Sequence, residues 1–327
     1  SYDRAASLRS ASDLFNFLVP LLALLLVTRS AQARWLSRAL VSVACVIALH
    51  ALVQYALGAD QLSHRPTGPF SHYMTLGGFL VLVDCFLLAW IAFADGWRRW
   101  WSWAALLLLQ AALLVSFTRN AWIALTALVV VVTLVRRPRL LLAWAALFLV
   151  LLVLAPTPLV ARFGSIVDLD ERSNYDRLCM AYAGAEMIAD RPLLGHGPRT
   201  VRILYPYYRH PTAPSLWVPH LHNSFLNLGA ERGLLSVAAL LGMLGVAARR
   251  AFERLRASPP QAERELLVAV LLVILATLVT GLFEDYWNDT EIQRLVLFSL
   301  ALPFCLPPST APAPDRTSSP DDEAPAA

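Results

Sequence analysis

The chain contains no lysine and few charged residues of any kind. All 27 basic residues are arginine, charged residues make up 15% of the 327 positions, and hydrophobic residues make up 57%. Soluble domains carry about 25% charged and about 45–50% apolar residues. Secreted disulfide scaffolds, disordered chains, coiled coils and nucleic-acid-binding domains therefore fit poorly, and we expect no nucleic acid partner. A protein that crosses a membrane several times fits well.

The sequence also lacks the motifs of metal and nucleotide sites. It has no dense set of acidic residues for Mg²⁺, no His/Cys spacing typical of a metal site and no Walker loop. We therefore expect no metal and no cofactor, and a reaction here would need an already activated donor. We also expect no disulfide framework, because the cysteines are far apart and mostly lie in apolar stretches: Cys45, Cys85, Cys179 and Cys305.

Nine apolar segments are candidates for membrane spans. A helix needs about 20 mostly apolar residues to cross a bilayer, with a range of about 17–25. The apolar residues do not alternate with period two, which disfavours strands. The sequence therefore predicts an all-α, polytopic transmembrane bundle with spans at 13–28, 39–57, 73–94, 101–118, 120–135, 139–155, 224–247, 265–283 and 290–306.

The arginines between these segments indicate which side faces the cytoplasm. They cluster in alternate loops, around 29–38, 98–99, 136–139 and 249–264, and short cytoplasmic loops are rich in Arg. Residues 156–222 then form a long periplasmic loop within a membrane domain of residues 1–306. We expect this loop to be ordered, because it keeps aromatic residues and an amphipathic helical stretch at 175–188. The Pro- and Ser-rich tail, 307–327, is predicted to be a disordered cytoplasmic end.

The densest polar segment begins at His220, where the long loop joins a membrane helix. His222 at this outer face could act as a general base near neutral pH. The alternative is that His222 and Asn223 only cap the helix that follows, because Asn is a favoured N-cap residue. Glu231 would lie about two turns into that helix, where an acidic group needs a partner such as Arg232.

Three arginines are candidates for binding a phosphate at the same face. Arg119 interrupts a long apolar run, Arg177 starts the amphipathic stretch of the loop, and Arg65 lies in a Gly/Pro-rich turn. Each also has a simple alternative role. Arg119 could be a helix-end residue that reaches lipid phosphate. Arg177 could be a solvated surface charge, and Arg65 could be an ordinary loop residue. Several guanidinium groups around one cavity would suit a pyrophosphate. Asp84, inside a span, is expected to contact another helix.

Four short motifs resemble those of the membrane O-antigen ligase and polymerase superfamily, and the resemblance covers most of the chain. The superfamily pattern of His-Asn, nine residues and Gly-x-x-Gly is matched except that Ser236 replaces the last Gly. The other three patterns are a Thr-Arg at the outer start of a span, an Arg before a Pro-Leu-Leu-Gly-x-Gly turn, and an Arg-x-x-Gly-x-Phe loop. The matching residues are His222-Asn223 with Gly233, Thr118-Arg119, Arg177 with Pro192–Gly197, and Arg65–Phe70.

The resemblance implies a reaction and roles for these residues. A glycan would move from undecaprenyl pyrophosphate to a sugar hydroxyl of lipid A–core, at the periplasmic face of the bacterial inner membrane, with inversion. Arg119 and Arg177 would hold the pyrophosphate, and His222 would position or deprotonate the acceptor hydroxyl. Further substrate-binding candidates are Arg65, Asn223, Glu231 and His220, and Asp285 or Asp289 could orient the other groups.

Other functions remain open at this stage. An O-antigen or exopolysaccharide polymerase would use the same donor with a glycan repeat as acceptor, and a protein O-oligosaccharyltransferase would use Ser or Thr. A lipid-linked glycan transporter would perform no chemistry, although the sequence shows no evident internal repeat. Superfamily members have about a dozen spans, so nine spans imply a missing N-terminal portion. The partners expected are the lipid-linked donor, a glycan acceptor and membrane lipid; the oligomeric state is undetermined.

Overall fold

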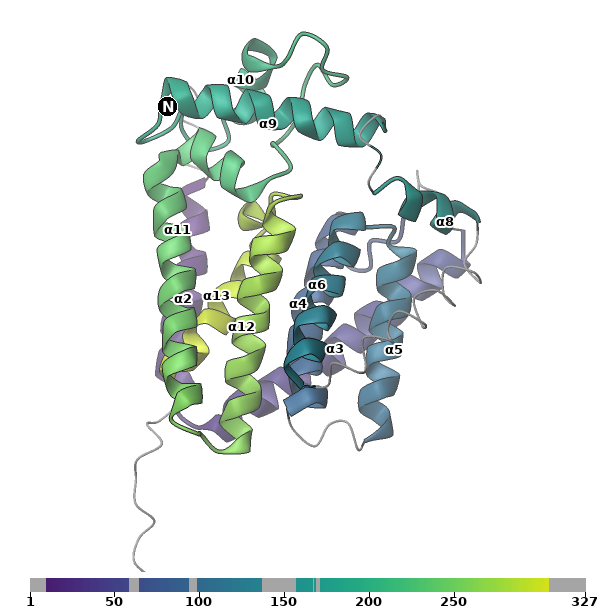
Figure 1. Cartoon of the computed structure of the whole chain (residues 1–327), viewed down its shortest axis with the longest axis vertical. Helices are drawn as coiled ribbons and strands as arrows, with labels where there is room; N and C mark the ends of the chain where they lie inside the picture. Colours follow the sequence, from purple (N-terminus) through teal and green to yellow (C-terminus); the bar gives the residue numbers. More distant parts are fainter. Residues whose placement is uncertain are drawn as a thin grey trace, which may run out of the picture.

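The computed structural model describes residues 10–58, 65–93, 99–136, 157–166, 168 and 171–305. Every regular element in these residues is a helix (Figure 1). The upright bundle consists of η1 (Ala11–Phe17), α2 (Leu18–Leu26), α3 (Ser30–Ala56), α4 (Tyr73–Phe93), α5 (Trp100–Val115), α6 (Arg119–Arg136), α11 (Ser224–Arg256), α12 (Gln261–Gly281), η3 (Tyr286–Asn288) and α13 (Thr290–Cys305). Across one end of the bundle lie α8 (Thr157–Gly164), α9 (Arg172–Asp190) and α10 (Val201–Tyr208).

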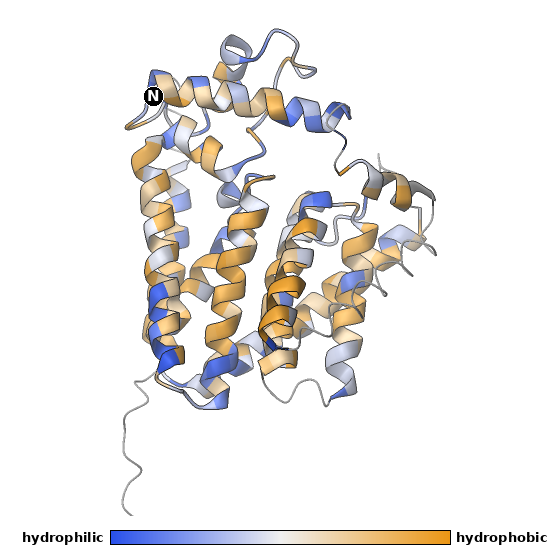
Figure 2. Cartoon of the chain, viewed as in Figure 1, coloured by the Kyte–Doolittle hydropathy of each residue, from blue (hydrophilic) through white to orange (hydrophobic). Residues whose placement is uncertain are grey.

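The helices confirm the predicted membrane bundle. Each predicted span coincides with a helix, except 139–155, which lies outside the described residues, as does the predicted tail at 307–327. Within the described residues, five helices are long and apolar enough to cross a membrane, namely α3, α4, α6, α11 and α12. Two further apolar helices, η1–α2 and α5, are shorter. Apolar residues cover the upright helices, whereas polar residues concentrate at their ends and in α9 (Figure 2).

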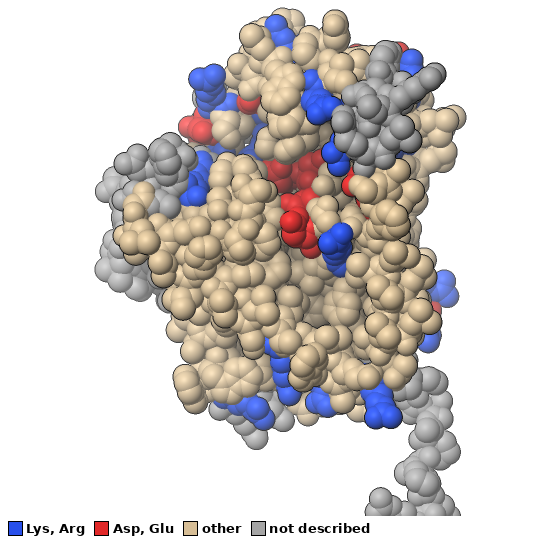
Figure 3. Space-filling view, turned by 180° about the vertical axis from the view of Figure 1, so that it is seen from behind, with Lys and Arg blue, Asp and Glu red and all other residues tan. Residues whose placement is uncertain are grey.

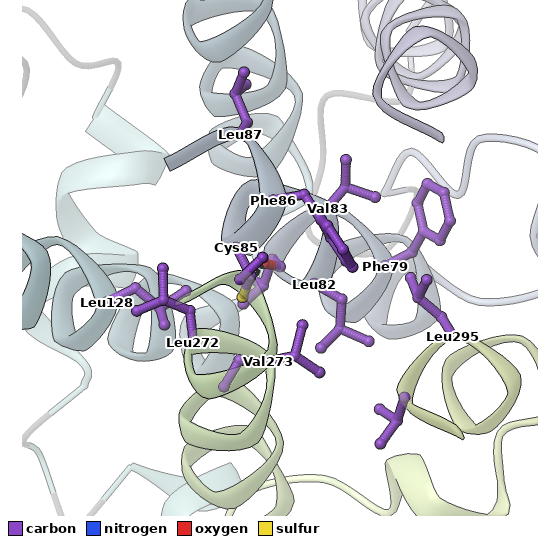
Figure 4. Close-up of a cluster of buried hydrophobic side chains, with 14 of the residues drawn as sticks. Phe79, Leu82, Val83, Cys85, Phe86, Leu87, Leu128, Leu272, Val273 and Leu295 are labelled. Carbon is purple, nitrogen blue, oxygen red and sulfur yellow. Dashed lines mark hydrogen bonds between the residues drawn. The ribbon is translucent and has the colours of Figure 1, made fainter. Parts of the chain in front are cut away.

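Helix α4 is the centre of the bundle because its sequence is apolar on every face. All of its residues from Thr75 to Ile91 are buried, as expected of a helix with no polar side. Figure 4 shows Leu82 of α4 near Val273 of α12, and Phe79 of α4 near Leu295 of α13. Asp84 is also buried in α4, where its Oδ2 accepts a hydrogen bond of 3.0 Å from Gln110 of α5. The predicted helix–helix contact of Asp84 is thereby confirmed.

The long loop forms a separate layer over the bundle. The predicted amphipathic stretch is part of α9, which lies across the ends of the upright helices, with α10 beyond it (Figure 1). The layer has its own small apolar core, which is built from α9, α10 and the segment before α11 and includes Met180, Met187, Val201, Tyr205, Val218 and Leu221. The layer is therefore packed by its own side chains as well as against the membrane helices.

Two glycines allow this layer to dock on α11. Gly233 has a φ of 80° at a break in α11, and a Cβ there would lie 2.0 Å from the carbonyl oxygen of Leu193. Gly195 has a φ of 63°, and its Cβ would lie 2.5 Å from the carbonyl carbon of Glu231. The N–H of Gly197 donates to the Glu231 carbonyl at 2.8 Å. The turn at Pro192–Gly197 and the helix segment around Gly233 thus pack backbone against backbone, and the two glycines leave no room for a side chain.

Candidate functional site

His222 lies immediately before α11 and is held by a buried carboxylate. Its Nδ1 is 2.8 Å from Oε2 of Glu284, which lies in the turn after α12 and whose side chain is 7% exposed. A carboxylate only accepts hydrogen bonds, so Nδ1–H donates and Nε2 keeps its lone pair. The backbone of His222 has a φ of 49°, a left-handed conformation unusual for a residue with a side chain. The pair therefore presents an imidazole that can accept a proton at Nε2.

Glu284 is ionised although it is buried. Burial by itself raises the pKa of its carboxyl, but the hydrogen bond from His222 and the electrostatic interactions with His222, His220 and Arg177 outweigh burial and lower that pKa below its ordinary value. Sequence reasoning missed Glu284. The only signal was that it stands in a short acidic turn between two spans, where Asp285 and Asp289 were the expected orienting groups.

The two expected acids bind elsewhere in that turn. Asp285 Oδ2 accepts a hydrogen bond of 2.8 Å from Asn288, and burial raises the pKa of Asp285 well above its ordinary value. Asp289 Oδ2 accepts a hydrogen bond of 2.6 Å from Thr75, at the start of α4. Neither carboxylate has a hydrogen bond or ion pair to His222 among the described contacts, so only Glu284 has the geometry to orient this imidazole.

His220 lies beside His222 in the same cluster. The two ring centroids are 4.3 Å apart, and Nδ1 of His220 is 3.6 Å from Oε1 of Glu284. Burial lowers the pKa of His220 to about 4, a shift that Glu284 opposes and that His222, His72 and Arg177 reinforce. His220 is therefore neutral at physiological pH. His72, which sequence reasoning did not select, also faces this cluster, since Glu284 and His222 both affect its pKa.

Arg177 of α9 interacts electrostatically with this cluster and with the other two arginines, and it is uncommitted. Its side chain is half-buried on α9 and makes no hydrogen bond or ion pair with the residues that the structure describes. Its charge helps to lower the pKa values of His220 and Glu284 on one side. On the other side is Arg65, whose pKa is lowered first by burial and then by Arg177, and whose guanidinium carbon lies 4.3 Å from the Tyr73 ring centroid.

Arg119, by contrast, is fully engaged with the outer layer. Its guanidinium is 4% exposed. It donates to the carbonyl and hydroxyl oxygens of Ser165 at 2.7 and 2.9 Å, to Ser173 Oγ at 3.0 Å and to Glu171 Oε2 at 3.2 Å. Glu171 is the N-cap residue of α9 and accepts from Asn174 N–H. Arg119 thus anchors the start of α9 and, through that helix, sets the position of Arg177.

Asn223 and Glu231 serve the scaffold. Asn223 is the N-cap of α11, and its Oδ1 accepts from two backbone N–H groups while its Nδ2 donates to the Leu282 carbonyl at 3.1 Å. Glu231 is buried and accepts a hydrogen bond of 3.3 Å from Val201 N–H at the start of α10. The expected partner of Glu231, Arg232, pairs instead with Asp13 at 3.6 Å, so backbone N–H groups replace the arginine. A substrate-binding role for both residues stays a prediction.

The cluster also has a set of possible metal ligands. One ligand atom each from His220, His222 and Glu284 lie within 4.8 Å of one another. In the observed arrangement, however, the His222 Nδ1 that a cation would need is already hydrogen-bonded to Glu284. These contacts fit an acid–base pair better than a preformed metal centre, and the expectation that no metal takes part stays a prediction. Figure 3 shows acidic side chains gathered at a hollow between the outer layer and the bundle, with basic side chains beside it.

Part of the chain matches a known protein family. Residues 103–241 match the family model described as O-antigen ligase, whereas no curated protein matches the chain. The matched segment runs from α5 into α11 and contains Arg119, Arg177 and His222; Arg65 and Glu284 lie outside it. The motifs that predicted this family are therefore placed together in one membrane bundle, three of them within the matched segment. Residues 103–241 thus form a segment that is similar to the O-antigen ligase family.

Proposed function

We propose that the chain transfers a glycan from undecaprenyl pyrophosphate to a sugar hydroxyl of lipid A–core, at the periplasmic face of the inner membrane. The observation that carries this proposal is the His222–Glu284 pair together with the half-buried, uncommitted Arg177, whose charge acts on Glu284. A base and an unpaired cation at one membrane end suit attack by a hydroxyl on a sugar whose leaving group is an anion. The family assignment supports the same reaction class.

In the proposed step, His222 Nε2 accepts the proton of the acceptor hydroxyl. The acceptor oxygen forms a bond to the anomeric carbon from the side opposite the pyrophosphate. The bond between that carbon and the pyrophosphate oxygen breaks, and its electron pair leaves with the pyrophosphate. Glu284 stabilises the imidazolium that forms, because its carboxylate lies 2.8 Å from Nδ1. A single attack of this kind inverts the anomeric centre.

The three arginines have different roles toward the leaving group in this proposal. Arg177 can direct its guanidinium donors at the pyrophosphate, because no protein partner among the described residues occupies them. Arg65 is half-buried, and burial and the charge of Arg177 lower its pKa. Its guanidinium lies over the ring of Tyr73, the first residue of α4, and adds positive charge there. Arg119 contributes by fixing α9 through Ser165 and Glu171. The proposal therefore gives Arg177 direct contact with the pyrophosphate and gives Arg119 a positioning role.

The test is transfer by the purified protein in lipid nanodiscs with a defined undecaprenyl-linked donor. Lipid A–core and a single glycan repeat are offered in separate reactions, and His222→Ala is the inactive control. Glycosylation of lipid A–core by wild type alone supports the proposal. Extension of the repeat without transfer to lipid A–core would instead identify a polymerase, and absence of both products with an intact donor would reject glycosyl transfer to a sugar hydroxyl.

A further inference from the structure

A pocket lined by three arginines opens at the end of the bundle opposite the candidate site. Helices α4 and α12 run between the two, because Tyr73 and Gly281 lie at the site end whereas Trp90 and Gln261 lie at the other. The pocket has a volume of about 340 Å³. Its walls come from α3, α4, α12 and the residue before α5, and the lining residues are Arg34, Arg38, Trp90, Arg99, Gln261, Ala262 and Glu265.

Among the described residues that line this pocket, basic groups outnumber acidic ones. Three guanidinium groups face one carboxylate, Glu265, whose nearest approach to Arg34 is 4.0 Å between Nε and Oε1. The Nε–H of Arg34 is buried and has no hydrogen-bond acceptor among the described residues. Arg38 lies with its guanidinium carbon 5.1 Å from the Trp90 ring centroid, and no ion pair neutralises it within the described residues. An anion with several acceptor oxygens would satisfy these donors.

The tryptophans around the pocket place it at the depth of lipid headgroups. Trp35, Trp100 and Trp103 are exposed near its rim, at the starts of α3 and α5. Trp101 packs on Trp90 with ring centroids 4.5 Å apart. Tryptophan is enriched at the boundary between hydrocarbon and water, where its ring sits among the headgroups. Figure 3 shows further basic side chains gathered at this end of the molecule.

A much smaller pocket, with a volume of about 20 Å³, adjoins the basic one between α3, α4 and α12. It shares Arg38, Trp90 and Glu265 with the first pocket. Its other walls are mostly apolar, and they include Val41, Phe86, Leu266 and Ala269. Helix α3 also exposes apolar side chains beside the basic pocket, among them Val43 and Val46. A basic pocket next to an exposed apolar helix face has the two-part chemistry of a phospholipid, which free phosphate lacks. We propose that this pocket binds the phosphate of an anionic phospholipid, whose acyl chain lies in the bilayer against the exposed face of α3.

The test is native mass spectrometry of the full chain released from nanodiscs that contain equal amounts of phosphatidylglycerol and phosphatidylcholine. Wild type is expected to retain phosphatidylglycerol, and Arg34→Ala, Arg38→Ala and Arg99→Ala combined should lower its retention about tenfold. The matched control combines Arg249→Ala, Arg250→Ala and Arg256→Ala, which removes the same charge from exposed positions at the end of α11. The control should retain phosphatidylglycerol as wild type does.

Three outcomes would overturn the proposal. Equal losses in the two triple variants would mean that general surface charge attracts the lipid. Displacement of the lipid by millimolar inorganic phosphate would mean that the pocket recognises phosphate without an acyl chain. If the pocket triple variant does not fold, the single change Arg99→Glu decides the question, because it reverses one pocket charge at an exposed position before the start of α5. Unchanged retention by folded Arg99→Glu would also reject the site.

Discussion

Nδ1 of His222 lies 2.8 Å from Oε2 of Glu284, across the junction between α11 and the turn that follows α12. The pair is held from both sides, since Ser224 Oγ next to His222 donates to the Glu284 carbonyl at 2.9 Å. The Ser224 hydroxyl therefore holds the backbone of Glu284, and the N–H of Asp285 donates to Oε1 of its carboxylate at 3.2 Å. This arrangement gives His222 one tautomer and one orientation, which is what a general base requires.

Glu284→Gln should lower glycan transfer about 100-fold or more, because the amide cannot stabilise the imidazolium that forms during proton transfer. The measurement is the initial rate of transfer in nanodiscs at saturating donor and acceptor. Glu291→Gln is the control, because it changes an exposed acid a few residues further along the chain. A Glu284→Gln protein that folds and turns over at the wild-type rate would remove this pair from the mechanism.

Arg177→Ala should abolish detectable transfer, and Arg177→Lys should recover only a small part of it. Loss of one donor aimed at developing charge costs about 100–1,000-fold in rate, and an ammonium group cannot reproduce a planar, multidentate contact. The measurement is the transfer rate of each variant and its apparent KM for the lipid-linked donor. Arg172→Ala, an exposed arginine on the same helix, serves as control. Full activity with lysine would show that Arg177 acts as a simple point charge.

Arg119→Ala should impair both the fold of the outer layer and the reaction. It removes four hydrogen bonds and leaves the partly buried Glu171 without its cation, a loss of about 3 kcal/mol. Limited proteolysis should cut near the start of α9 more quickly than in wild type, and transfer should fall in parallel. Ser173→Ala removes one of these bonds and should have a much smaller effect. Loss of transfer with unchanged proteolysis would instead indicate that Arg119 contacts substrate directly.

The protein should become less stable as pH falls below 6.5, because protonation of His220 favours the unfolded chain. Its folded-state pKa of about 4 lies below the ordinary value of 6.5, so the unfolded chain binds more protons between these two pH values. The stabilisation is complete above pH 6.5 and is lost as pH falls toward 4. The thermal midpoint of wild type should decrease by a few degrees, about 2–4 °C, between pH 7 and pH 5. His220→Gln should flatten this slope, whereas His210→Gln, outside the cluster, should leave it unchanged.

Gly233→Ala should destabilise the protein strongly, because a Cβ at that position would lie 2.0 Å from the Leu193 carbonyl oxygen and the residue has a φ of 80°. Gly242→Ala on the same helix should be neutral or slightly stabilising, since nothing lies within 4 Å of its Cβ position. Thermal unfolding in detergent followed by tryptophan fluorescence compares the two variants. Equal stability would show that the outer layer does not depend on the close contact at Gly233.

Local sequence features determine which segments form helices and where several of them begin. The all-apolar sequence of α4 predicts a buried central helix, and Asn223 predicts the start of α11, where its side chain accepts the first free N–H groups. The interruption at Arg119 likewise separates α5 from α6. Hydrophobic periodicity and helix capping depend only on residues that are close in sequence, so both can be recognised from the sequence alone.

The partners of the polar side chains were decided only by the tertiary structure. Glu284 reaches His222 across 62 positions of sequence, and Arg119 reaches Glu171 across 52. Glu231 is satisfied by the N–H of Val201 and not by the neighbouring Arg232. Charge and hydrogen-bonding capacity are visible in a sequence, but which groups meet depends on how separate helices pack, and that packing is set by apolar contacts over the whole bundle. The motifs thus predict the family and the end of the bundle at which the candidate site lies. Only the tertiary structure shows that Glu284 pairs with His222 and that Arg177 has no hydrogen-bond partner among the described residues.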